Sequence, residues 1–197
     1  LSATSLARGA LSKRLVSASS DGVLVNLPNG ETRKMASGPS SELAKAVVEQ
    51  FAKKFMKDPA VILMSESAKK LLLKDDDLCQ AIGFDVDVST VLPDLILAEL
   101  GEKQPIIVFI ECVASDGPIN DRRKLELLEL AAKAGYKEKD CVCVTVFRDR
   151  SNSVSRKLVP SISWGTFIWY ASEPDNIIYL REGNEERAVS IGGFLEL

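Results

Sequence analysis

Short apolar runs alternate with amphipathic stretches along most of the chain, a pattern typical of α/β folds. The apolar runs predict strands, which we expect at 61–64, 94–100, 105–113, 141–147, 166–171 and 177–180. Apolar residues at helical spacing predict helices, which we expect at 41–57, 121–134 and 151–159, with a shorter one around Leu71 or over 78–82. Turn residues between two extended pieces predict a hairpin at 23–35. We therefore predict an α/β fold in which helices flank one mixed β-sheet.

The two central strands each contribute an acidic residue to the same place. A hairpin closed by the short link 101–104 pairs Leu100 with Pro105, and counting back along both strands places Asp94 opposite Glu111 on one face of the sheet. The middle of this hairpin is apolar on both faces, so we expect it to be buried.

Two carboxylates side by side in such a place repel each other, so that one takes up a proton or a divalent cation binds between them. Oxygen ligands favour a hard ion such as Mg²⁺. A structural interpretation stays open, in which Asp94 opens a strand after a proline and Glu111 pairs with a nearby arginine. A single β-bulge would also separate the two acids.

Two basic groups follow strands that end near this pair. Arg122, Arg123 and Lys124 lie in the first turn of a helix capped by Asn120, where the helix dipole disfavours cations. Either a phosphate docks there or the turn is solvated and neutralised by neighbouring acids. The second group follows the strand at 141–147 and consists of Arg148, Arg150, Arg156 and Lys157. Acids, a metal ion and flanking cations suit phosphodiester hydrolysis, with the cations holding the DNA backbone.

Composition narrows the chemistry further. The chain has 197 residues and a formal net charge of -3, which excludes a uniformly basic nucleic-acid-binding surface. Histidine is absent, which excludes imidazole bases and zinc sites with histidine ligands. The four cysteines show no CxxC spacing and predict reduced, buried thiols of a cytoplasmic protein. No apolar stretch is long enough to cross a bilayer, so we expect no membrane partner.

Four separated segments agree in order and spacing with a known family. They are PDLILAEL (93–100), ECVASDGPINDRRKLELLEL (111–130), CVTVFRDR (143–150) and SRKLVPSISWGTFIWYASEPDNI (155–177). Together they resemble the BsuBI/PstI family of type II restriction endonucleases, which is similar to the PD-(D/E)XK nucleases. The resemblance implies a restriction-endonuclease-like core and Mg²⁺-dependent cleavage of double-stranded DNA at a short palindromic site. It also implies a homodimer and, as functional partner in a restriction-modification system, a DNA methyltransferase.

The resemblance also divides the chain. It implies a PD-(D/E)XK-like nuclease domain at 40–197, preceded at 1–39 by an N-terminal arm and hairpin that we interpret as a remnant of an upstream domain. Because the sequence starts at Leu1, we expect that it is either processed or lacks its natural start.

Site roles carry over by position. Asp94 matches the first acid of the nuclease motif and Glu111 the second, and the backbone carbonyl of Cys112 would be a further metal ligand. Val113 stands where the general pattern has a lysine, so a cation from elsewhere would have to orient the attacking water. Arg122, Arg123 and Lys124 are nearest in sequence, and we favour Arg123 for this catalytic role.

Several further residues have two interpretations each. Ser115 would share the face of Glu111 and bind water or phosphate in the catalytic site, or it is a turn hydroxyl. Glu49 and Glu66 match acidic positions of the family pattern and would assist the metal, or they are surface acids. Three aromatic residues would stack on bases or pack in the core: Trp164, Trp169 and Tyr170.

Two rival functions stay open. The missing lysine at position 113 favours a non-catalytic DNA-binding or subunit-interaction domain. A metal-dependent phosphohydrolase for small nucleotides would need the acid pair without any DNA contacts.

Overall fold

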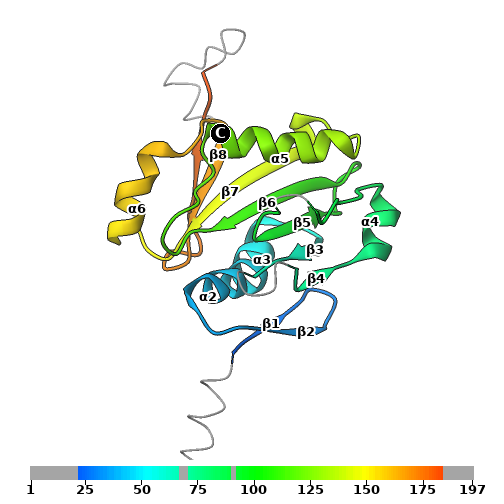
Figure 1. The fold of residues 1–197 in the computed structure, drawn as a ribbon, viewed down its shortest axis with the longest axis horizontal. Helices are drawn as coiled ribbons and strands as arrows, with labels where there is room; N and C mark the ends of the chain where they lie inside the picture. The colour runs from blue at the N-terminus through cyan, green and yellow to red at the C-terminus, as the bar shows by residue number, and fades with distance from the viewer. Residues whose placement is uncertain (1–21, 67–70, 90–91, 184–197) are drawn as a thin grey trace, which may run out of the picture.

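A computed structural model describes residues 22–66, 71–89 and 92–183. These residues form a seven-stranded mixed sheet with helices on both faces, as predicted, and a separate two-stranded hairpin (Figure 1). The strand order in the sheet is β4-β3-β5-β6-β7-β8-β9. In chain order the strands are β3 (Pro59–Met64), β4 (Leu73–Lys74), β5 (Leu95–Glu99), β6 (Ile106–Cys112), β7 (Cys141–Phe147), β8 (Thr166–Tyr170) and β9 (Ile177–Leu180).

Strand direction decides which ends of the strands meet. β6, β7 and β8 are parallel, whereas β5 runs antiparallel to β6. The carboxyl ends of the three parallel strands therefore lie at the same edge of the sheet as the start of β5. This edge, which we call the acidic edge because it holds Asp94 and Glu111, is where the sequence motifs converge.

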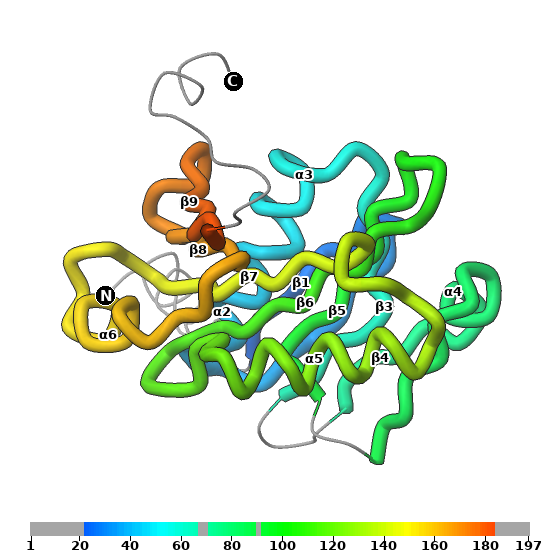
Figure 2. Tube along the Cα trace, turned by 90° about the horizontal axis from the view of Figure 1, so that it is seen from above, coloured from blue at the N-terminus to red at the C-terminus, as the bar shows by residue number. Residues whose placement is uncertain are grey.

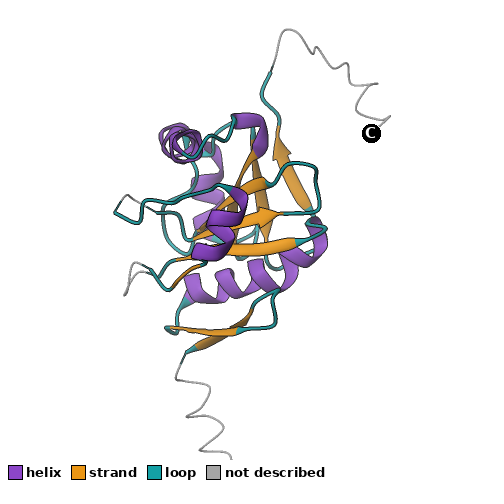
Figure 3. Ribbon diagram, turned by 90° about the vertical axis from the view of Figure 1, so that its right-hand side faces the viewer, coloured by secondary structure: helices purple, strands orange, loops and turns teal. Residues whose placement is uncertain are grey.

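One face of the sheet is covered by a continuous helical segment and, outside it, by the hairpin. The segment consists of α2 (Pro39–Ala46), the π-helical turn η1 (Val47–Phe51) and α3 (Ala52–Phe55). The hairpin consists of β1 (Val23–Asn26) and β2 (Thr32–Met35) and lies against this segment on the side away from the sheet (Figure 3). Hairpin, helix and sheet share one apolar cluster. The division of the chain at residues 39 and 40 stays a prediction.

The opposite face is covered by α4 (Asp76–Ile82) and α5 (Asp121–Lys133), and Figure 2 shows the sheet between α3 and α5. The side chain of Asn120 caps α5 by accepting the N–H of Arg123 at 2.9 Å. The helix ends before Gly135, whose φ of 85° suits glycine. Three shorter pieces complete the helices: η2 (Glu138–Asp140), α6 (Ser153–Leu158) and η3 (Val159–Ser161).

Of the two positions predicted for the short helix, the one over 78–82 is confirmed by α4, whereas the one around Leu71 is wrong. Leu73 and Lys74 are extended and pair with the end of β3, and the helix starts only at Asp76. The carboxylate of Asp75 caps this helix by accepting the N–H of Leu78 at 2.9 Å, which fixes its start after the strand. The other predicted elements are found with boundaries shifted by a few residues.

The central strands are buried on both faces, as their composition predicts. Trp169 and Tyr170 are core residues, whereas the side chain of Trp164 is exposed. Of the residues that the structure describes, no helix combines the length and the apolar character needed to cross a bilayer.

Candidate active site

The predicted register of β5 and β6 is confirmed. Leu95 pairs with Ile110 without a bulge between the two strands, so Asp94 and Glu111 are the next opposed positions. The backbone of Asp94 is fixed by the residue that follows β3, because its carbonyl accepts the N–H of Ser65 at 2.8 Å. Its side chain is fixed by β6, because Oδ2 accepts the N–H of Cys112 at 2.7 Å. The carboxylate of Asp94 therefore points across the sheet toward the end of β6.

The two carboxyl groups perturb each other. Burial raises the pKa of Asp94, although the Cys112 N–H, a hydrogen bond with Glu111 and the charge of Arg123 oppose this. Burial and then the charge of Asp94 raise the pKa of Glu111 to about 7, although Arg123 opposes the rise. Simultaneous ionisation of both carboxyl groups is therefore unfavourable, as expected for a site that takes up a proton or a cation.

Arg123 of α5 contacts this pair directly. Its Nε donates to Glu111 Oε1 at 2.7 Å, and its Nη1 lies 3.1 Å from Glu126 Oε2 on the same helix. The side chains of Arg123 and Glu111 are 14% and 12% exposed, so the ion pair is largely shielded from solvent. The arginine partner that the structural interpretation of Glu111 predicts is therefore found, beside the acid pair that the register predicts.

The other two cations of this helix start also have partners. Arg122 is exposed and pairs with Glu126 at 2.9 Å. Lys124 Nζ donates to the carbonyl of Trp164 at 3.1 Å and lies 3.5 Å from Glu138 and from Glu182. Carboxylates of the chain itself therefore offset the unfavourable position of these cations in the first helical turn.

The two residues that follow Glu111 are buried in apolar clusters. Val113 is buried in an apolar cluster with Phe147 and Tyr170. The Cys112 side chain is buried in the cluster on the other face of the sheet, and burial raises the pKa of its thiol well above the ordinary value. A protonated, buried thiol is a poor metal ligand, so a contribution of Cys112 to a metal site would have to come from its carbonyl.

The remaining candidate acids and Ser115 have other partners. Ser115 is exposed and its hydroxyl donates to Asp116 at 3.1 Å. Glu49 Oε1 accepts the backbone and side-chain N–H groups of Asn26 at 2.9 and 2.8 Å, which fastens the hairpin to η1. Glu66 Oε2 accepts the N–H of Ala36 at 2.9 Å. Among the described residues, no group of three or more Cys, Asp or Glu side chains could hold a metal ion, so neither Glu49 nor Glu66 is brought to the pair.

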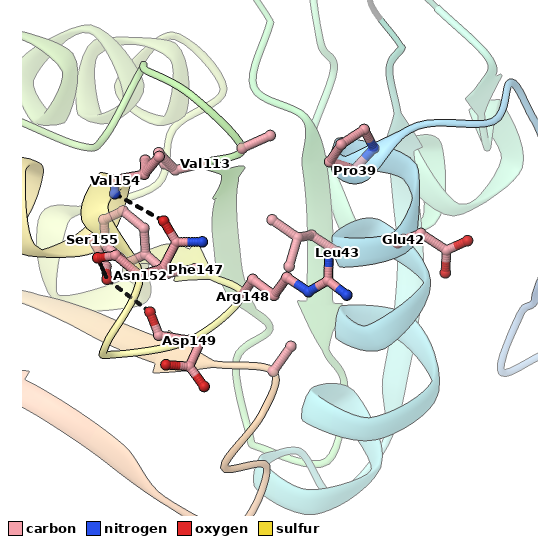
Figure 4. A pocket seen from close by; sticks show the side chains of 12 residues that line it. Pro39, Glu42, Leu43, Val113, Phe147, Arg148, Asp149, Asn152, Val154 and Ser155 are labelled. Carbon is pink, nitrogen blue, oxygen red and sulfur yellow. Dashed lines mark hydrogen bonds between the residues drawn. The ribbon is translucent and has the colours of Figure 1, made fainter.

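A cavity of ≈ 500 Å³ lies at the acidic edge between α2 and α6 (Figure 4). Val113 and Ala114 line it directly after β6, and Phe147 and Arg148 line it at the end of β7. Arg148 extends across the cavity toward Leu43 of α2 (Figure 4). Among the lining residues that the structure describes, Arg148 carries the one positive charge.

The second basic group is only partly free. Arg150 pairs with Glu173 at 2.8 Å. Three exposed cations have no ion pair within the described ranges: Arg148, Arg156 and Lys157. These are the basic side chains near the acidic edge that can accept an external anion without first breaking an internal pair.

Two polar residues that hold the site in place could not be predicted from the sequence. Ser65 fastens the backbone of Asp94, and nothing in its turn sequence marks this role. Thr145 is fully buried in β7 directly beside Glu111, and its hydroxyl accepts the N–H of Ile119 at 3.1 Å. The signal for Thr145 is one hydroxyl within the apolar run CVCVTVF.

Known proteins resemble this chain in sequence and in fold. The profile of the family described as BsuBI/PstI restriction endonuclease domain matches residues 23–183. The chain is 30% identical over 157 residues to the type II restriction enzyme BsuBI of Bacillus subtilis, covering 79% of this chain and 47% of that protein. It also resembles the solved structure of the SdaI restriction endonuclease, with a TM-score of 0.71 and 25% identity, over 89% of this chain and 55% of that one.

The chain thus spans about half the length of the relatives it matches. The family match covers most of the chain, including the hairpin, the acid pair and both basic groups. On sequence, fold and extent of the match, the chain belongs to the BsuBI/PstI restriction endonuclease family.

Proposed function

We propose that this chain is the nuclease domain of a type II restriction endonuclease, which hydrolyses DNA phosphodiesters with Mg²⁺ held by Asp94 and Glu111. The observation that carries the proposal is the register that opposes the half-buried Asp94 and the buried Glu111 beside Arg123. The family membership supports the same activity.

The donor set fits a magnesium ion. The two carboxylates and the Cys112 carbonyl would offer three oxygens and no nitrogen or thiolate, which favours a hard cation. Since the described residues add no third acid, the remaining coordination positions would be left to water and to substrate oxygens, as Mg²⁺ commonly requires. Bound Mg²⁺ would supply charge stabilisation for the leaving oxygen and a more acidic water.

The residues of the chain have separate parts in this proposal. Asp94 is oriented by the Cys112 N–H, so its free oxygen is presented in one direction. Burial and the charge of Asp94 raise the pKa of Glu111 to about 7 without a metal ion, and a bound cation would favour its charged form. Arg123 would take the part of the absent lysine. Its guanidinium is fixed by Glu111 and Glu126, and in this proposal it would stabilise the charge on the attacked phosphate.

We assign the DNA backbone to Arg148, Arg156 and Lys157. They are exposed, follow the end of β7 and have no internal ion pair among the described residues. Arg122, Lys124 and Arg150 can contribute only by exchanging an internal carboxylate for a phosphate. The recognition of a short palindromic site, a homodimer, a partner methyltransferase and a cytoplasmic location belong to the same proposal.

Cleavage of supercoiled plasmid DNA by the purified chain tests the proposal. With Mg²⁺ we expect discrete fragments, and with a chelator none. Asp94→Asn and Glu111→Gln should abolish cleavage, whereas Glu102→Gln, which removes an exposed acid from the far end of the same hairpin, should not. If the wild-type chain binds DNA but cleaves none under any divalent cation, the non-catalytic DNA-binding domain that Val113 favours becomes the better account.

A further inference from the structure

Thr145 lies beside the acid pair. It is opposite Glu111 in the parallel ladder between β6 and β7, so both side chains project from the same face of the sheet. Thr145 is fully buried in a run that is otherwise apolar. A buried hydroxyl at such a position needs a polar partner, and the partner that it has identifies its role.

The Thr145 hydroxyl holds the residue that precedes the cap of α5. Its Oγ1 accepts the N–H of Ile119 at 3.1 Å, and the carbonyl of Ile119 accepts the N–H of Ser163 at 2.9 Å. Ile119 itself is fully buried. Both backbone groups of this residue are therefore fixed to the sheet side of the protein before the helix starts.

The chain leads from this point directly to Arg123. Asn120 caps the helix by accepting the Arg123 N–H at 2.9 Å, and the Arg123 side chain returns to Glu111 at 2.7 Å. These contacts link Glu111 to Thr145 in the sheet, Thr145 to the start of α5, and the start of α5 back to Glu111 through Arg123. A shift of Ile119 therefore moves the guanidinium relative to the carboxylate that it contacts.

We infer that the Thr145 hydroxyl is a positioning group, which sets the start of α5 so that Arg123 reaches Glu111. This inference rests on the proposed catalytic part of Arg123. Valine would occupy the same volume as Thr145 but would leave the Ile119 N–H without its acceptor in the core, so the loop would have to move. Serine would retain the acceptor.

The test compares Thr145→Val, Thr145→Ser and Tyr136→Phe. Tyr136→Phe is the matched control, because it removes the buried hydrogen bond of 2.7 Å to the Ile82 carbonyl near the opposite end of α5. The first readout needs no activity: exchange with solvent of the Arg123 Nε–H, followed by NMR. We expect faster exchange in Thr145→Val, with wild-type exchange in Thr145→Ser and in Tyr136→Phe. Wild-type exchange in Thr145→Val would overturn the inference.

The second readout is Mg²⁺-dependent DNA cleavage. Thr145→Val should lower kcat by on the order of 10²-fold with little change in KM, since small displacements of a catalytic group have effects of this size. Thr145→Ser should restore kcat. In an Arg123→Ala background Thr145→Val should have no further effect, because both changes remove the same contact. Equal losses in both backgrounds would show a merely structural role, whereas an inactive wild type with altered exchange in Thr145→Val would refute the nuclease proposal alone.

Discussion

The guanidinium of Arg123 lies 2.7 Å from Glu111 on a neighbouring element, whereas the valine at position 113 is buried in an apolar cluster. On the function proposed above, a helix would deliver the positive charge that the general nuclease pattern places on the strand, two residues after the second acid.

Replacement of Arg123 tests whether its charge takes the part of the lysine in the general nuclease pattern. Arg123→Ala should lower kcat for Mg²⁺-dependent cleavage by on the order of 10²-fold, the usual loss when one charge-stabilising group is removed. Arg123→Lys should recover part of this loss because it retains the charge. Lys133→Ala, at the other end of α5, is the control for a lost cation on the same helix. Full activity in Arg123→Ala would assign the positive charge to another residue.

Val113→Lys tests whether a lysine at the position given by the general nuclease pattern can act in this fold. We expect destabilisation on the order of 3 kcal/mol and no gain in cleavage rate, because the longer charged side chain would displace the apolar packing of Val113 against Phe147 and Tyr170. Val113→Met introduces a chain of similar length without charge and should cost less. Urea unfolding of both variants measures the difference, and a stable, more active Val113→Lys would contradict the observed packing.

The stability of the metal-free protein should depend on pH through Glu111. Its pKa is raised from 4.5 to about 7 on folding, so the neutral form is favoured in the folded state. The stabilisation is complete below pH 4.5 and is lost as the pH rises to about 7, with a total on the order of 3 kcal/mol.

Glu111→Gln should remove this dependence. Urea unfolding between pH 4 and 8 should give a difference between wild type and Glu111→Gln that grows with pH in favour of the variant. Glu102→Gln serves as the control, and a wild-type stability that rises between pH 5 and 7 relative to Glu111→Gln would contradict the assignment.

Arg148 should contribute a phosphate contact. Arg148→Ala should weaken DNA binding about equally for all sequences and reduce the slope of log affinity against log salt by about 1. Lys103→Ala removes an exposed cation from the β5–β6 link at the opposite edge and should leave the slope unchanged. Fluorescence anisotropy with a labelled duplex at several salt concentrations makes the comparison, and equal slopes for both variants would remove Arg148 from the DNA contacts.

The sheet and the acid pair could be predicted because they depend on local patterns. The turn between β5 and β6 fixes their register, and the register alone opposes Asp94 and Glu111. The positions of the central strands can be predicted because each is a continuous apolar run, which is typical of a strand buried on both faces.

Tertiary contacts explain what the sequence could not show. The short strand β4 forms because Leu73 meets the end of β3, which no local preference reveals. Arg123 was one of three adjacent cations, and only the docking of α5 on the sheet decides that its side chain, and not that of Arg122 or Lys124, reaches Glu111. Glu49 matched an acidic position of the family pattern, yet its carboxylate is used to fasten the hairpin.

Direct measurement of cation binding tests the central claim that Asp94 and Glu111 hold a divalent metal together. Calorimetric titration with Mn²⁺, which accepts the same oxygen ligands as Mg²⁺, should detect a site in the wild type and in Glu102→Gln. The site should be absent from Asp94→Asn and from Glu111→Gln. Undiminished binding in both of these variants would contradict the account.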